Sequence, residues 1–279
     1  MKLRAVLLLV LLLLPIVGMA NEEGGNSSEL PSLVGMLTHH QGVVYEWVNI
    51  IYAFVVSIIL CIVAVTVYKK RQMIPGPFQN GVEMLVEGMS DFIHSILGND
   101  APRYVPFLGT LFFYILLMNL MGIIPLGHSP STNINVTGSL AILVFLYVQY
   151  TGFSRLGVKR YFHHLIGEPS DAITWAISPI LFLIHVVGEF AKPFSLALRL
   201  FGNITGEDIL VAAFVGLGIT ALSFVGSPVG LPLHIPFILL GILLSTIQAL
   251  VFTLLSTIYI LMMLPHDEGD HAEVHGAHH

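Results

Sequence analysis

The run Phe194-Ser-Leu-Ala-Leu-Arg199-Leu-Phe-Gly-Asn203 sets a charged residue in the middle of an apolar stretch that reaches from residue 173 to about residue 225. Apolar runs of about 20 residues or more are typical of transmembrane helices. An arginine at mid-bilayer depth costs roughly 2.5–3.5 kcal/mol on insertion scales, and it stays charged because a guanidinium is not deprotonated in proteins. We therefore expect Arg199 either to serve an ion pathway or to pair with a buried anion.

The composition of the 279-residue chain is that of a membrane protein. Hydrophobic residues make up 55% of it and charged residues 10%, whereas soluble domains carry about 25% charged residues. Further apolar runs long enough to cross a bilayer cover residues 48–68, 107–125, 136–153 and 235–264. The sequence thus predicts an all-α, polytopic membrane protein, with five transmembrane helices in a membrane domain of residues 46–265.

The first 20 residues have the pattern of a secretory signal peptide. Lys2 and Arg4 form a positive start, a short apolar core follows, and small residues end the segment at Ala20. We expect cleavage after this segment; an uncleaved anchor helix is the alternative. Residues 21–45 would then form a polar segment outside the cytoplasm.

The basic residues predict an orientation. Lys and Arg follow the first and third spans and precede the second, whereas the connections 126–135 and 226–234 contain none. Cytoplasmic loops carry the excess of Lys and Arg, so we expect the mature N-terminus outside and the C-terminus in the cytoplasm. Residues 78–97 carry Glu83, Glu87 and Asp91 at helical spacing, which favours an amphipathic helix on the membrane surface.

The C-terminal residues 266–279 are rich in histidine and acids. This composition favours a disordered cytoplasmic tail, and its spacing does not match an ordered zinc site. The sequence shows no phosphate-binding glycine loop, no nucleophile constellation and no nucleic-acid patch. We therefore expect no cofactor, no metal site, no nucleic-acid partner and no ATP hydrolysis by this chain itself.

Polar residues recur along the fourth span. Offsets of three and four residues share one helix face, and Glu207 and Asp208 lie roughly 12 to 14 Å beyond Arg199. Glu189 precedes Arg199 by a little short of three turns, so none of these acids is a simple ion-pair partner in a straight helix. This arrangement predicts two half-channels separated by a fixed positive barrier. The residues on the shared face are Lys192, Ser195, Arg199 and Asn203. Lys192 has an alternative role, because a lysine near a helix end can extend to the interface.

The last span is polar along one face as well. Gln248 is its one strongly polar group at depth, and it could either hydrogen-bond Arg199 across the helix pair or line an aqueous path. The second span carries Asn119. The face of the last span that holds Gln248 follows three- and four-residue steps through Ser245, Gln248, Phe252, Ser256 and Tyr259.

These motifs resemble the signature of subunit a of the F-type ATP synthase, and the resemblance covers about residues 47–264. The matching motifs are Lys192-Pro193 … Ser195-Leu-Ala-Leu-Arg199-Leu-Phe-Gly-Asn203, the run from Gln248 to Tyr259, Met118-Asn119-Leu120-Met121 with Pro125, and Asn135-Val-Thr137. The resemblance implies a proton-translocating stator subunit of the F0 sector in a bacterial inner membrane. It also implies the c ring, the b subunits and the rest of the F1F0 complex as partners, with the last two helices long and tilted against the c ring.

The resemblance further implies residue roles. Arg199 would match the essential arginine of the family, and Gln248 would hold its guanidinium. Asn203 and Ser195 would line the same face. One of the two acids Glu207 and Asp208 would match the acid found beyond the arginine in an access channel; the sequence leaves the choice between them open.

Two positions depart from the family pattern. Gly241 stands where many members carry a histidine or an acid one heptad before the glutamine, and Gly122 stands where an acid often follows the hairpin asparagine. Other groups should therefore line the access channel. The possible lining residues are Asn119, His185, Glu189, His234, Ser245 and Tyr259.

Two other functions compete with an ion-conducting stator subunit. A stand-alone secondary transporter would use Arg199 to bind an anionic substrate and would be built from inverted repeats, of which the sequence shows no convincing example. A purely structural membrane anchor would tolerate neutral substitutions of Arg199 and Gln248.

Overall fold

The computed structural model describes residues 48–69, 72, 75–124, 129–166, 172–223 and 233–264. Nearly all of these residues are helical, and no strand occurs among them, so the predicted all-α class is confirmed. The expected signal peptide, the segment that follows it and the histidine-rich tail lie outside the described residues.

The long helices of the described ranges lie close to the predicted spans. In this part of the chain, five stretches are long and apolar enough to cross a membrane, which agrees with a multi-pass architecture. Short 3₁₀ turns η1 (Gly98–Asp100) and η2 (Pro130–Thr132) precede two of the helices. The helices are α4 (Val48–Lys69), α5 (Pro77–Leu97), α6 (Ala101–Ile123), α7 (Ile134–Leu165), α8 (Ala172–Ser223) and α9 (Ile235–Leu261).

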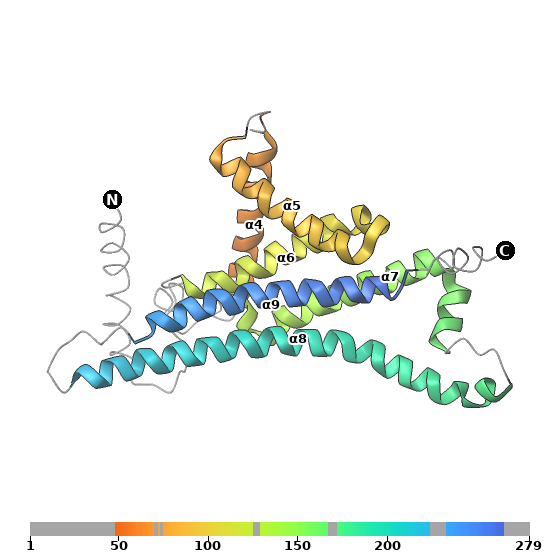
Figure 1. The fold of residues 1–279 in the computed structure, drawn as a ribbon. Helices are drawn as coiled ribbons and strands as arrows, with labels where there is room; N and C mark the ends of the chain where they lie inside the picture. Colours follow the sequence, from red (N-terminus) through yellow and green to blue (C-terminus); the bar gives the residue numbers. More distant parts are fainter. Residues whose placement is uncertain are drawn as a thin grey trace, which may run out of the picture.

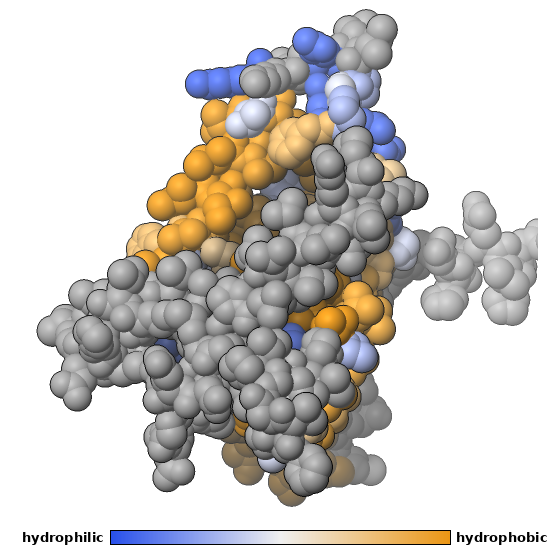
Figure 2. All heavy atoms as spheres, turned by 90° about the vertical axis from the view of Figure 1, so that its left-hand side faces the viewer, coloured by the Kyte–Doolittle hydropathy of each residue, from blue (hydrophilic) through white to orange (hydrophobic). Residues whose placement is uncertain are grey.

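Helices α7, α8 and α9 run side by side (Figure 1), with α7 and α9 each in contact with α8. Helix α6 packs on α9, and α4 and α5 extend from the α6 side of this group, away from α8. Figure 2 shows polar residues gathered at the end of the molecule where α4 and α5 meet, beside a broad apolar surface. This separation is what a protein with one end in the aqueous phase requires.

One face of α6 forms the centre of the core. Its buried side chains recur every three or four residues and include Tyr104, Leu108 and Ile115, because residues at that spacing share a helix face. They pack with Phe252 and Ile260 of α9 in one apolar cluster. The α6–α9 contact therefore holds the last helix in place.

Helix α4 is the least buried of the long helices. Phe54, Ile58 and Ile62 are exposed along it, although exposed side chains of this size are unfavourable in water. Such a surface agrees with a helix whose outer face meets lipid or another membrane subunit.

Helix α5 corresponds to the predicted amphipathic segment. Glu83, Glu87 and Asp91 are exposed on it, whereas Ile93 and Leu97 are buried against the core. A helix therefore forms at this position with its acids exposed; its place on the membrane surface stays a prediction.

Helix α8 is unusually long. It contains 52 residues and continues through Pro179 and Pro193. At 1.5 Å per residue it measures about 78 Å, more than twice the hydrocarbon thickness of about 30 Å. A strongly tilted course fits this length and stays a prediction.

Candidate ion pathway

Arg199 lies on an exposed face of α8. Among the described residues it makes no hydrogen bond or ion pair; the ion pairs found there join Arg155 to Asp100 and Lys192 to Glu189. The expectation that no acid of its own helix neutralises Arg199 agrees with this geometry. An unpaired charge in an apolar medium is costly, so a counter-ion from outside the described residues would stabilise Arg199.

Gln248 connects α9 to α8 through Asn203. The Asn203 Nδ2 atom donates to Gln248 Oε1 at 2.6 Å, and Gln248 is 3% exposed. Asn203 lies four residues after Arg199 and so occupies the same helix face. The expected hydrogen bond between Arg199 and Gln248 is absent from the described part of the chain. Gln248 instead accepts a hydrogen bond from Asn203, one turn beyond Arg199.

Glu207 lies against Gly241 of α9. A Cβ atom built on Gly241 would stand 2.1 Å from Glu207 Oε1, so the carboxylate occupies the space of the missing side chain. Gly241 is buried, and both Glu207 and Asp208 are half-buried. The glycine that departs from the family pattern is therefore what gives Glu207 its position between α8 and α9.

Several buried polar atoms between α8 and α9 have no hydrogen-bond partner among the described residues. Buried polar groups in proteins are normally paired, and each unpaired one costs about 1–3 kcal/mol. A polar site that offers several such atoms is suited to hold water. The atoms are Thr205 Oγ1, Glu207 Oε2, Ser245 Oγ and Gln248 Nε2. They extend the polar region from the Gln248 contact to the Glu207–Gly241 contact.

Asn119 of α6 is a structural neighbour of this region. Its Oδ1 accepts a hydrogen bond from Ser131 at 2.8 Å, and its Nδ2 lies 3.5 Å from the carbonyl oxygen of Ser245. A Cβ atom on Gly122 would lie 2.8 Å from Ser129 Cβ. Gly122, the second departure from the family pattern, thus makes room for the turn that bonds to Asn119.

His234 precedes α9 and lies at the far end of the pathway from the start of α8. It is 4% exposed and its Nδ1 has no partner among the described residues. Burial lowers the pKa of His234 from its ordinary value, because a buried site disfavours the charged imidazole.

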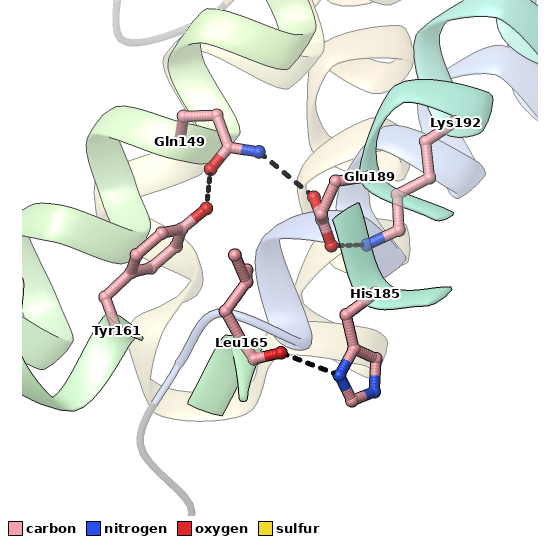
Figure 3. A network of polar contacts seen from close by, with 6 residues as sticks. All are labelled: Gln149, Tyr161, Leu165, His185, Glu189 and Lys192. Carbon is pink, nitrogen blue, oxygen red and sulfur yellow. Dashed lines mark hydrogen bonds and ion pairs between the residues drawn. The ribbon is translucent and has the colours of Figure 1, made fainter. Parts of the chain in front are cut away.

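His185 and Glu189 lie on the other side of Arg199. His185 is exposed, and its Nδ1 is 2.9 Å from the carbonyl oxygen of Leu165. Glu189 lies near α7 (Figure 3) and precedes Arg199 along α8. The structure therefore places His185 and Glu189 before Arg199 on α8 and His234 at the start of α9; that these residues line a channel stays a prediction.

A second polar cluster surrounds Glu189 (Figure 3). Gln149 of α7 donates to Glu189 Oε2 at 3.0 Å, Lys192 pairs with Glu189, and Tyr161 donates to Gln149. The Lys192 Nζ atom also lies 5.3 Å from the ring centre of Tyr259 on α9. Lys192 is thus engaged by groups of α8 and α9; its extension to the interface stays an alternative prediction.

Sequence reasoning missed Gln149 and Tyr161. A glutamine inside the apolar third span was a usable signal, since buried amides seek partners. Tyr161 gave no such signal, because it follows the predicted end of that span.

Ser195 lies exposed beside Arg199. In the described residues, no group of three or more His, Cys, Asp or Glu side chains could hold a metal ion.

These features define a multi-pass helical membrane protein in which Arg199 lies between two polar clusters along α8. Residues 50–261 match the family described as ATP synthase A chain. The chain is 42% identical over 248 residues to ATP synthase subunit a of Protochlamydia amoebophila, a match that covers 87% of this chain and 91% of that protein. It belongs to the ATP synthase A chain family.

Further relatives carry the same name. ATP synthase subunit a of Geotalea daltonii is 36% identical over 211 residues, which cover 76% of this chain and 85% of that protein. The protein of the same name from Oleidesulfovibrio alaskensis is 35% identical over 221 residues, which cover 79% and 88% of the two chains. Membership in this family, together with the membrane-spanning helices, makes the chain a component of an ion-transporting, ATP-synthesising assembly.

Proposed function

We propose that this chain is the proton-translocating stator subunit of the F0 sector and that Arg199 separates its two half-channels at the interface with a c ring. The observation that carries the proposal is the exposed, unpaired guanidinium between two polar clusters of α8. A carboxylate on a passing c subunit would supply the counter-ion. Of the alternatives, a secondary transporter lacks support from repeats, and a structural anchor leaves the unpaired Arg199 without a use.

Arg199 would act by its fixed charge. A nearby cation favours the ionised form of a carboxyl group, so a c-ring carboxyl that reaches Arg199 would release its proton. The same charge repels a proton that approaches from either side. Lysine would serve less well, because a desolvated amine can lose its proton and a guanidinium does not.

The access half-channel would lie between α8 and α9 on the Glu207 side of Arg199. The unpartnered polar atoms found there support this assignment. We assign the relay role to Glu207 in preference to Asp208, because the Glu207 carboxylate faces the gap that Gly241 leaves in α9. His234 would stand near the outer mouth. The release half-channel would lie on the Glu189 side.

The proposal includes the surroundings of the chain. It would lie in a bacterial inner membrane with the mature N-terminus outside and the C-terminus in the cytoplasm, as the distribution of Lys and Arg favours. Its partners would be the c ring, the b subunits of the peripheral stalk and the rest of the F1F0 complex, and ATP chemistry would take place on other subunits.

ATP-driven proton uptake by liposomes that hold the whole complex tests this proposal. Arg199→Ala should abolish uptake while the complex stays assembled. Arg103→Ala is the matched control, because Arg103 is an exposed arginine near the start of α6 and belongs to neither cluster, and it should leave uptake unchanged. Full uptake by an assembled Arg199→Ala complex would overturn the proposal.

A further inference from the structure

We infer that the cluster formed by Gln149, Tyr161, Glu189 and Lys192, here called the Glu189 cluster, is a positioning device that holds the α8 turn at Pro193 and thereby fixes Arg199. The inference rests on the proposed function for the task of Arg199. The mechanical claim, that these side chains hold this turn, stands on the contacts alone.

Pro193 creates a weak point in α8. Proline has no N–H, so the carbonyl oxygen of Glu189 lacks the donor that residue 193 would supply in a regular helix. Helix α8 nevertheless continues through this position. The side chains of Glu189 and Lys192 form an ion pair across the same turn and are only 15% and 18% exposed. The ion pair therefore bridges the turn in which the backbone bond is missing.

The cluster also attaches this turn to α7. Gln149 Nε2 donates to Glu189 Oε2 at 3.0 Å, which leaves the other carboxylate oxygen for Lys192. The amide oxygen of Gln149 accepts the hydroxyl proton of Tyr161, and this contact fixes the orientation of the amide. Each polar group of the cluster is thus held by the next one (Figure 3).

The fold of α7 is arranged to make this contact. Gln149 and Tyr161 are 12 residues apart, a separation that would place them about 18 Å apart along a straight helix. Gly157 has φ 74° and ψ 158° and bends the end of α7, a conformation that favours glycine. A Cβ atom on Gly152 would lie 3.0 Å from the Tyr161 ring. Both glycines therefore serve the approach of Tyr161 to Gln149.

The α8 turn that the Glu189 cluster holds lies shortly before Arg199. Lys192 lies seven residues before Arg199, which is about two helical turns and places both on one face. Its ammonium group lies over the Tyr259 ring at 5.3 Å, so α9 takes part as well. A shift of about 1 Å at a reacting group can cost 100-fold in rate. A loose turn at Pro193 would therefore misplace the guanidinium.

Amide hydrogen exchange of the α8 peptide that covers residues 189–199 tests the mechanical claim in the intact complex. Glu189→Ala should raise its exchange rate about tenfold. Tyr161→Phe, which removes one hydroxyl and disturbs the fold least, should raise it about threefold. Tyr150→Phe is the matched control, since Tyr150 is a neighbouring tyrosine of α7 that is 66% exposed, and it should change nothing. Wild-type exchange in both Glu189→Ala and Tyr161→Phe would overturn the inference.

The ratio of protons taken up to ATP hydrolysed separates positioning from proton carrying. Glu189→Gln keeps one acceptor oxygen, which can serve either Lys192 or Gln149, so the ratio should fall less than in Glu189→Ala, which should lower it severalfold. If Glu189→Gln lost coupling as fully as Glu189→Ala with α8 still protected, Glu189 would be a proton carrier and the inference would fail. Arg199→Ala, measured alongside, tests the proposed function separately.

Discussion

The carboxylate of Glu207 fills the volume that a side chain at position 241 would occupy: a Cβ atom on Gly241 would lie 2.1 Å from Glu207 Oε1. The last two helices are therefore complementary at this point, with an acid on α8 and a gap on α9. Many members of the family carry an ionisable residue on the α9 side of this contact, as the resemblance implies. In this chain the ionisable group at the same place comes from α8.

The Glu207–Gly241 contact predicts that the two neighbouring acids differ in function. Glu207→Gln should lower ATP-driven proton uptake about tenfold or more, since removal of a group that transfers protons has effects of this size or larger. Asp208→Asn should keep uptake within about twofold of wild type. Uptake by liposomes that hold each assembled complex measures both effects. If only Asp208→Asn lost uptake, Asp208 would be the relay and the assignment to Glu207 would be wrong.

The gap at Gly241 predicts a coupled effect of substitution. Gly241→Ala should displace the Glu207 carboxylate and destabilise the α8–α9 contact by about 1–3 kcal/mol, the usual cost of overpacking. The same substitution in a Glu207→Ala background should cost far less, because the space is then empty. Thermal unfolding of the four variants of this double-mutant cycle measures the coupling. Additive effects would show that the two residues do not share this volume.

The turn beside Asn119 predicts a local stability effect. Gly122→Ala should lower the stability of the helical hairpin by about 1–3 kcal/mol, because its Cβ would lie 2.8 Å from Ser129 Cβ. Gly109→Ala on the same helix is the matched control, since no atom lies within 4 Å of its Cβ position. The melting temperature in detergent should fall for Gly122→Ala only. Equal melting temperatures would argue against a close approach of the turn to α6.

Buried His234 predicts that stability depends on pH. Burial lowers its pKa in the folded state below the ordinary value of 6.5, so the unfolded state binds more protons below about pH 6.5. Stability should thus be unaffected by this residue above that pH and should decrease as the pH falls below it. His234→Gln should show a weaker decrease between pH 7.5 and about pH 5.5 in thermal unfolding. An identical decrease in both proteins would exclude His234 as its source.

Most of the fold followed from apolar run lengths. The prediction for residues 48–68 differs from α4 by one residue, because Lys69 and Lys70 end the apolar run directly. The third span was predicted to end at residue 153, whereas α7 continues to Leu165. Its last part is polar, so hydrophobicity marked where the apolar part ends and not where the helix ends.

The site was predictable along each helix but not between helices. Arg199 and Gln248 were identified from a charge and an amide in apolar spans. The Asn203–Gln248 bond was not, since the rotation of one helix against another depends on packing. The same reason left Glu207 and Asp208 undecided, because adjacent residues of a helix point in directions that differ by about 100°.

ATP-driven proton uptake and passive proton flux, measured on one preparation, test the role of Arg199 most directly. Liposomes that hold the whole complex are assayed for ATP-driven uptake and, after removal of F1, for passive proton flux. Arg199→Ala should lose ATP-driven uptake and still conduct protons passively, because the two half-channels are then no longer separated by a fixed charge. Adding Glu207→Gln should lower that passive flux. ATP-driven uptake at the wild-type rate in the assembled Arg199→Ala complex would contradict the account.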